Sequence, residues 1–233
     1  MRCFNNECVV LLHGLGRTKR SMKLLQAEFE KHGFVVKSIG YKSRHFPINT
    51  MASEVFEELS KDKRLYSYDM VHFIGHSLGS IVIRKVILRE YLPNLGRVIL
   101  LAPPNNGAKA AQLFLCNPIA YFILGHVGKE LANGIYLNKT CGTTKQFVSL
   151  GLGRGLIITG NQNLTWWDPV SWITTFLLKK PHDGKVTLEE SLLPGTDHIS
   201  VDCNHMLIMR HKKTIEEASM FIRSVTATKL LPV

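Results

Sequence analysis

The sequence lacks the features that mark several common classes of protein. Its 233 residues include only five cysteines, an odd number with no CxxC pair, which argues against both a disulfide framework and a zinc ribbon. Reduced thiols in a cytoplasmic protein are the simplest interpretation. The apolar run near the N-terminus is too short for the core of a signal peptide. The most apolar stretch, residues 110–124, is interrupted by Gln112, Asn117 and Pro118 and falls short of the roughly 18 apolar residues of a membrane-spanning helix.

Acidic residues are scarce as well. Asp and Glu total 18 against 29 Lys and Arg, which gives the chain a formal net charge of +11. This balance favours anionic surroundings such as a membrane face, an acidic partner or nucleic acid, without choosing among them. Because no recognised nucleic-acid-binding motif accompanies the charge, we expect no nucleic-acid partner.

Apolar residues are plentiful and ordered in a pattern. They make up 45% of the chain against 20% charged residues, so disorder as the overall state is excluded. Short runs rich in Val, Ile and Leu lie at residues 8–12, 34–39, 70–74, 97–101 and 155–159, with helical patterns at 21–33, 50–61 and 80–91 between them. Such runs are typical of strands buried on both faces. The sequence therefore predicts an α/β fold with a doubly wound, mostly parallel sheet, in which ligands bind beyond the carboxyl ends of the strands.

The third apolar run is followed by Gly75-His76-Ser77-Leu78-Gly79, a G-x-S-x-G motif between a strand and a helix. A turn this tight forces the serine into a strained conformation, and larger side chains at the two glycines would collide with the neighbouring strand and helix. Ser77 is thereby predicted to stand at the sheet edge, with the N-terminus of the next helix directed at the same point. We interpret Ser77 as a candidate nucleophile and His76 as a packed or hydrogen-bonded histidine.

The first apolar run ends in His13-Gly14-Leu15-Gly16. An HG pair at this point lets the backbone turn away and present an amide. The N–H groups of Leu15 and Leu78 would then converge as an oxyanion hole, and His13 would fix the loop.

A serine hydroxyl needs a base, and the base needs an orienting acid. Asp183 lies in the turn Pro-His-Asp-Gly-Lys, and His205 follows a short run at residues 198–201 and precedes a helical pattern. The chain order Ser77, Asp183, His205 is the order expected for this architecture. Alternatives remain open for the base and for the acid: His198, and Asp168, Asp197 or Asp202.

The stretches VVLLHGLGR, FIGHSLGS, LLAPPNNGAKAA, HDGKV and CNHM resemble the α/β-hydrolase superfamily, and in particular small bacterial lipases and esterases and lipase-like deacylases. The resemblance implies Ser77 as nucleophile, His205 as base, Asp183 as orienting acid, and oxyanion amides from Leu15 and Leu78. It also implies that no metal or organic cofactor is used, and we find no convincing metal-ligand cluster in the sequence. Because the additional hairpin of the fullest members does not precede the HG strand, we expect a trimmed sheet of about six strands.

The segment 105–152 is long for a plain connection between strands. Within a single domain spanning residues 1–233, we expect this segment to form a small cap or lid over Ser77. An acyl group would lie against apolar side chains of the segment, namely Leu113, Phe114, Phe122 and Ile123. The alternative interpretation is that these side chains simply complete the core.

Together these features predict a serine hydrolase that cleaves carboxylic esters through an acyl-enzyme on Ser77, with a small-molecule or lipid ester as substrate. An acyltransferase or thioesterase with the same triad is the first alternative, and a catalytically silent binding module is the second. Arg17, Lys19 and Arg20 follow the HG turn near the mouth of this site, and they favour peripheral contact with an anionic membrane surface or an acidic substrate. The expected location is cytoplasmic, peripheral to a membrane where these residues reach one.

Overall fold

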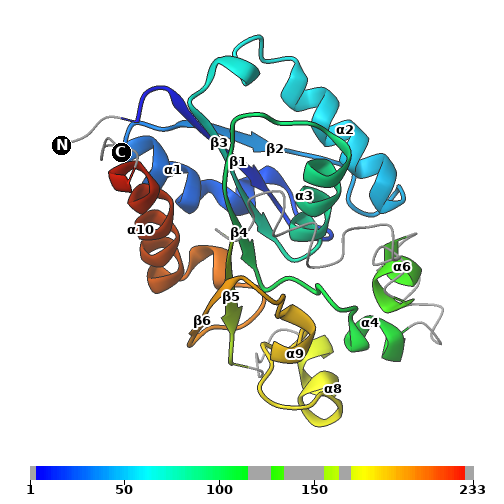
Figure 1. Cartoon of the computed structure of the whole chain (residues 1–233). Coiled ribbons are helices and arrows are strands. Elements are labelled where there is room, and N and C mark those ends of the chain that lie inside the picture. Colours follow the sequence, from blue (N-terminus) through cyan, green and yellow to red (C-terminus); the bar gives the residue numbers. More distant parts are fainter. Residues whose placement is uncertain (1–3, 115–126, 134–154, 163–168, 229–233) are drawn as a thin grey trace.

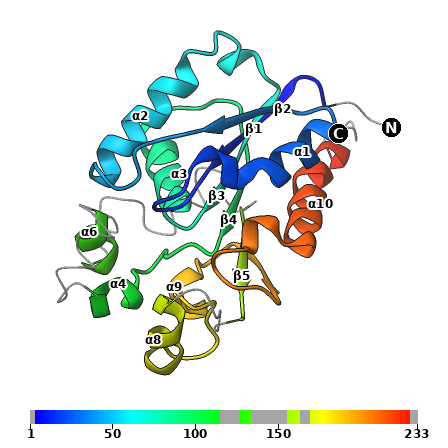
Figure 2. The same ribbon diagram turned by 180° about the vertical axis from the view of Figure 1, so that it is seen from behind.

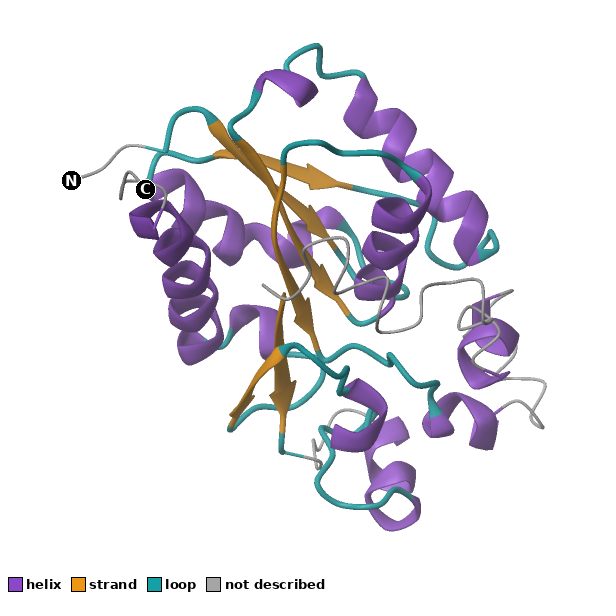
Figure 3. Cartoon of the chain, in the orientation of Figure 1, coloured by secondary structure: helices purple, strands orange, loops and turns teal. Residues whose placement is uncertain are grey.

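The structure, a computed structural model, describes residues 4–114, 127–133, 155–162 and 169–228. Within these residues, six strands form one sheet in the order β2-β1-β3-β4-β5-β6, and every neighbouring pair is parallel (Figures 1 and 3). The strands are β1 (Glu7–Leu12), β2 (Val35–Ile39), β3 (Met70–His76), β4 (Leu95–Leu101), β5 (Gly155–Gly160) and β6 (Asp197–Val201). The predicted doubly wound parallel sheet of about six strands is confirmed.

Helices cover both faces of the sheet. Figures 1 and 2 show α1 (Lys23–Lys31) and α10 (Lys212–Thr228) on one face, with α2 (Ile48–Ser60) and α3 (Leu78–Arg89) on the other. The alternation along β1 explains this arrangement. Val10 and Leu12 belong to the core under α2 and α3, whereas Val9 and Leu11 belong to the core under α1 and α10. A strand that is apolar at every position can bury both faces, which is the pattern of a parallel sheet.

Strand β2 differs from the prediction that its apolar run is buried on both faces. Most residues of β2 are half-buried, and most of β6 are exposed. Both strands lie at the edges of the sheet, where one side has no neighbouring strand. An apolar run therefore predicts a strand but not its place in the sheet.

The order of the strands creates a crevice at the point where the functional candidates lie. From β1 the chain passes outward to β2 and then returns to β3 on the other side of β1. Leu12 at the end of β1 is paired with Gly75 near the end of β3. The connections that leave these two strands therefore separate, and such a switch point is where open α/β sheets bind ligands.

Part of the predicted insertion 105–152 is described. Its α4 (Lys109–Phe114) and α6 (Val127–Asn133) pack on one another, and the Gln112 amide donates to the carbonyl of Ala132 at 2.5 Å. Ala111 and Leu131 join the core beneath α2 and α3. The rest of the insertion lies outside the described residues, so its role as a cap or lid stays a prediction.

The remaining described elements are short helices in the connections between the strands and longer helices. They are η1 (Lys19–Met22), η2 (Leu65–Ser67), α8 (Pro169–Leu177), α9 (Leu188–Ser191) and η5 (Ile208–Arg210). Among all helices in the described part of the chain, none combines the length and apolar character needed to cross a bilayer.

Candidate active site

Ser77 occupies the sharp corner between β3 and α3. Its backbone angles are φ 52° and ψ −118°, a region that L-residues with a side chain rarely adopt. The corner is held by hydrogen bonds on both sides: the Ser77 amide donates to the Leu101 carbonyl at 2.8 Å, and the Ser80 amide donates to the Ser77 carbonyl at 3.0 Å. The strain predicted from the G-x-S-x-G motif is therefore present at the serine itself.

The two glycines of the motif are required by close backbone approach. A Cβ at Gly75 would lie 2.6 Å from the amide nitrogen of Ser80. A Cβ at Gly79 would lie 2.6 Å from the carbonyl oxygens of Leu12 and His13. Because backbone atoms cannot move aside as a side chain can, these contacts explain why the elbow between β3 and α3 needs glycine on both sides.

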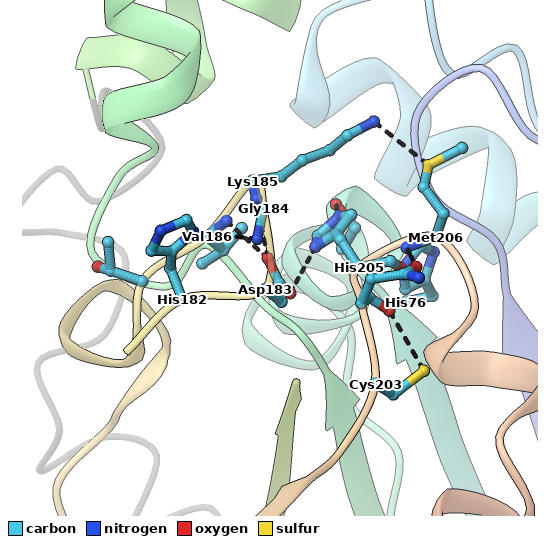
Figure 4. A network of polar contacts seen from close by, with 12 residues as sticks. His76, His182, Asp183, Gly184, Lys185, Val186, Cys203, His205 and Met206 are labelled. Carbon is cyan, nitrogen blue, oxygen red and sulfur yellow. Dashed lines mark hydrogen bonds and ion pairs between the residues drawn. The ribbon is translucent and has the colours of Figure 1, made fainter. Parts of the chain in front are cut away.

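His205 and Asp183 lie in line with Ser77. The Nε2 atom of His205 is 3.0 Å from the Ser77 Oγ, and its Nδ1 atom is 2.8 Å from the Asp183 Oδ2. Figure 4 shows the imidazole of His205 facing the carboxylate. His205 is 5% exposed and Asp183 is 3% exposed, so the pair is shielded from water. A carboxylate can only accept, which places the proton of the imidazole on Nδ1 and leaves Nε2 to accept from the serine hydroxyl.

Asp183 is fixed by its own turn. Its Oδ1 accepts hydrogen bonds from the backbone amides of Lys185 at 3.0 Å and Val186 at 2.9 Å, while its backbone carbonyl accepts from the His205 amide at 3.0 Å. A Cβ at Gly160, the last residue of β5, would lie 3.0 Å from the Asp183 Cβ. The acid turn is therefore pressed against the end of β5, although α8 intervenes in the sequence.

The Ala-Pro-Pro-Asn-Asn-Gly stretch after β4 supports the loop that carries the acid. Asn105 is fully buried and receives a 2.9 Å hydrogen bond from Arg84, while its own amide donates to the Ser191 carbonyl at 2.6 Å. The Asn106 side chain donates to the carbonyls of Glu189 and Leu192 at 3.0 and 2.9 Å. This motif therefore joins the end of β4 to α9, which follows the Asp183 turn.

The loop after β1 is held by a contact that the sequence did not suggest. The Tyr41 hydroxyl donates to the His13 carbonyl at 2.6 Å, and the Tyr41 and His13 rings are stacked with centroids 4.5 Å apart. The Gly16 amide donates to the Ser43 Oγ at 3.0 Å. Burial lowers the pKa of His13, so its ring is neutral here. The only sequence signal for Tyr41 was its place just after the second apolar run.

The predicted oxyanion donors lie on this loop and at the start of α3. Leu78 is the first residue of α3, and the first amides of a helix have no partner within the helix. Leu15 lies in the turn that the Arg17 amide closes on the Gly14 carbonyl at 3.2 Å. The pairing of Leu12 with Gly75 places the two loops next to each other at one edge of the sheet.

The rivals of the triad residues lie elsewhere or outside the described residues. His198 is an exposed residue of β6 whose Nε2 is 2.8 Å from the Thr159 Oγ1, rather than from the serine. Asp197 begins β6, Asp202 is exposed, and Asp168 lies outside the described residues. In the described part of the chain, no three His, Cys, Asp or Glu side chains are grouped as a metal site.

The four predicted substrate-binding residues are only partly placed. Leu113 lies on α4 with its side chain 44% exposed, and Phe114 ends the same helix. Phe122 and Ile123 lie outside the described residues. Their role in binding an acyl group stays a prediction.

Solved structures with a similar fold identify the architecture. The mature lipase BlEst2 of Bacillus licheniformis matches with a TM-score of 0.71 at 16% identity, over 94% of this chain and 93% of that chain. The metagenomic carboxyl esterase MGS0156 matches with a TM-score of 0.72 at 13% identity, over 97% and 77%. The carboxylesterase CesB of Bacillus subtilis gives 0.54 at 13% identity, over 94% and 84%. The chain has the α/β-hydrolase fold, as its resemblance to bacterial lipases and esterases implied.

The family follows from the sequence match. The model of the palmitoyl protein thioesterase family matches residues 8–147, which is more than half of the chain. The chain belongs to the palmitoyl protein thioesterase family and is an ester or thioester hydrolase of the α/β-hydrolase type. The match begins at β1 and includes both the HG loop and the Ser77 elbow.

Proposed function

We propose that the protein is a serine hydrolase that cleaves carboxylic esters or thioesters through an acyl-enzyme on Ser77. The observation that carries this proposal is the line of hydrogen-bond distances from Ser77 through His205 to Asp183, 3.0 and 2.8 Å long. A nucleophile, a base and an orienting group within such reach are the requirement for covalent acyl transfer.

The proposed reaction has two steps that use the same groups. The Ser77 oxygen attacks the carbonyl carbon while its proton passes to the His205 Nε2, and this imidazolium then protonates the leaving alcohol or thiol. Water, deprotonated by His205 in the same way, releases the acid and restores the serine. Asp183 keeps the Nδ1 proton in place and stabilises the positive charge that forms on the ring.

Two backbone amides stabilise the negative charge of the tetrahedral intermediate in this proposal. We assign this role to Leu15 and Leu78, because the switch point between β1 and β3 brings their loops to one edge of the sheet. Each such donor contributes on the order of 3 kcal/mol to the barrier reduction in serine hydrolases. The N-terminus of α3 adds its positive dipole end.

The acyl chain is assigned to the insertion 105–152. Leu113 on α4 presents an exposed apolar side chain, and we place Phe114, Phe122 and Ile123 in the same role. A cap of this kind would exclude water from the acyl-enzyme and set the preferred chain length. In this proposal, residues 1–233 form one domain that carries the cap as an insertion.

The family match favours a thioester over an oxygen ester as the natural bond. Its description names a palmitoyl protein thioesterase, which points to a long-chain acyl thioester as substrate. The triad itself does not discriminate, because a thiolate and an alkoxide can both leave with a proton from His205. The preference for an ester or a thioester is therefore set by the groups around the triad.

Labelling with a fluorophosphonate probe tests the nucleophile. Wild-type protein should be labelled at Ser77, Ser77→Ala should not be labelled, and Ser224→Ala, which changes an exposed serine on α10, should be labelled fully.

Matched pairs of nitrophenyl esters and thioesters with two to sixteen acyl carbons then measure the preferred bond type and acyl chain length by kcat/KM. Ser77→Ala is expected to lose several orders of magnitude in kcat, and a Ser77→Ala enzyme with wild-type turnover contradicts the proposal.

Analysis of the reaction products separates the hydrolase from the alternative functions. Addition of an alcohol acceptor to the assay reveals an acyltransferase, because the acyl group then appears on the alcohol rather than as the free acid. A protein that binds acyl chains but neither labels nor turns over would be a silent binding module.

A further inference from the structure

A cavity of about 710 Å³ lies directly beside the HG loop. It is lined by residues from the end of β1, from η1, from β2 and the turn that follows it, and from α2. Its volume falls within the range of roughly 300–1,000 Å³ that small-molecule sites occupy. His13, which precedes the oxyanion turn, contributes to its wall, so the cavity adjoins the proposed reaction centre.

The charges around this cavity have one sign. Four cationic side chains line it, Arg17, Lys19, Lys37 and Lys42, against the single carboxylate of Glu58. Two neighbours outside the lining cancel each other, since Asp62 pairs with Lys37 at 2.8 Å and Lys61 pairs with Glu58 at 2.5 Å. Cations therefore exceed carboxylates by three. A concave surface of one sign concentrates the field and raises the local concentration of counter-ions.

Arg17 connects the cavity to the triad. Its Nη2 lies 3.1 Å from the Sδ of Met206, the residue after His205. The Nζ of Lys185 lies 3.2 Å from the same sulfur (Figure 4). Two cationic side chains thus contact one thioether sulfur, which is a weak acceptor and carries no charge. Burial lowers the pKa of His76 most, and the neighbouring His205, Arg17 and Lys185 lower it further, so the effect of the two cations extends to the residue before Ser77.

We propose that the cavity binds a phosphate group on the leaving-group side of the substrate, so that the enzyme prefers phosphate-bearing esters or thioesters. This inference rests on the hydrolase function proposed above. A guanidinium matches two phosphate oxygens at once, and ammonium groups add point charges around a dianion. Arg17 holds the phosphate at the mouth of the cavity, while Lys19 and Lys42 surround it further out.

Titration calorimetry with glycerol 3-phosphate tests the cavity without catalysis. The probe is titrated into the Ser77→Ala protein, and into the same protein with Lys19→Gln and Lys42→Gln. Loss of two cations should weaken binding of the phosphate by about tenfold or more, since each removes a charge-assisted contact with the dianion. The matched control is Lys212→Gln with Lys213→Gln, which removes the same charge from exposed residues of α10 that do not line the cavity. This control should bind the probe as the parent does.

A kinetic arm ties the cavity to substrate choice. In the enzyme with an intact Ser77, the ratio of kcat/KM for a phosphate-bearing thioester to that for a neutral thioester of the same acyl length is measured. The Lys19→Gln/Lys42→Gln protein should lower this ratio by about tenfold relative to the Lys212→Gln/Lys213→Gln protein. An unchanged ratio overturns the proposal.

The outcomes separate this proposal from the hydrolase function. If glycerol 3-phosphate binds but Ser77 neither labels nor turns over, the cavity assignment stands and the proposed function fails. If neutral thioesters are cleaved while glycerol 3-phosphate does not bind, the function stands and the cavity assignment is wrong.

Vesicles distinguish the source of the phosphate. Binding of glycerol 3-phosphate and of phosphatidylglycerol vesicles, but not phosphatidylcholine vesicles, with both lost in the Lys19→Gln/Lys42→Gln protein, identifies a lipid headgroup. Binding of glycerol 3-phosphate alone identifies a soluble phosphate ester. Binding of anionic vesicles alone overturns the cavity and leaves a basic membrane-facing surface in its place.

Discussion

The ring of His76 is hydrogen-bonded to the backbone of His205, with 3.0 Å between the His76 Nε2 and the His205 carbonyl oxygen. A carbonyl can only accept, so Nε2 carries the proton of His76. Within the described residues, Nδ1 of His76 has no hydrogen-bond partner, and a Cβ at Gly14 would lie 2.7 Å from it. His76 therefore touches the oxyanion loop and the loop of the base, and it directly precedes Ser77 in the chain.

This contact predicts that His76 positions His205. We expect His76→Leu to lower kcat by about 10–100-fold with a smaller effect on KM, because a displaced base misaligns the proton transfer. His76→Gln keeps an N–H donor near the carbonyl and should retain more activity. Steady-state kinetics on a short-chain thioester, with urea unfolding of each variant, provides the measurement. Equal kcat losses for Leu and Gln would argue against the positioning role.

Asp183→Asn tests the orienting acid with little structural disturbance. An amide still accepts from the amides of Lys185 and Val186, but it can present an N–H to the His205 Nδ1 and so favour the wrong tautomer. We expect kcat to fall by about 10³–10⁴-fold, as removal of the charge does in other Ser-His-Asp hydrolases. The circular dichroism spectrum should remain that of the wild type, and activity above a tenth of wild type would point to another acid.

Gly79→Ala should destabilise the protein through overpacking. The new methyl group would lie 2.6 Å from the carbonyl oxygens of Leu12 and His13, and β1 cannot yield without breaking its register. We expect a loss of about 1–3 kcal/mol in the free energy of unfolding, measured with urea. Gly40→Ala is the matched control, since nothing lies within 4 Å of a Cβ at Gly40. A Gly79→Ala protein as stable as this control would contradict the close approach.

The buried histidines predict a loss of stability in acid. Burial lowers the pKa of His13, and it lowers the pKa of His76 well below the ordinary value of 6.5, with the neighbouring His205, Arg17 and Lys185 adding to the effect. Below pH 6.5 these histidines become protonated in the unfolded chain but stay neutral in the native protein. The free energy of unfolding therefore falls as the pH falls.

Urea unfolding between pH 7.5 and pH 5.5 measures this dependence. For each proton that the unfolded chain binds and the native protein does not, the free energy of unfolding changes by at most about 1.4 kcal/mol per pH unit. His76→Gln should therefore flatten the curve relative to wild type. A variant with the wild-type slope would show that His76 titrates normally in the native state.

Most of the candidate site could be predicted from short motifs in the sequence. The elbow around Ser77 depends on residues within a few positions, so the pattern of glycines and the apolar run before them were sufficient. Chain order then limited the choice of acid and base. Asp183 was harder to place, because a helix separates it from β5, and only Gly160 marks the close contact between them.

Contacts between distant segments could not be read from the sequence. Arg17 and Met206 are 189 positions apart, and their contact depends on how the HG loop and the His205 loop meet above the sheet. The stacking of Tyr41 on His13 and the contact from His76 to His205 depend likewise on side-chain directions that no short pattern encodes. The edge positions of β2 and β6 follow from the order of strands, which apolar runs do not reveal.

The placement of His205 after β6 has a consequence for the growing polypeptide. The serine corner between β3 and α3 can form once the first four strands have been synthesised, because the Ser77 amide donates to the Leu101 carbonyl of β4. His205 follows β6, so we expect acylation of Ser77 only after all six strands have emerged from the ribosome and paired.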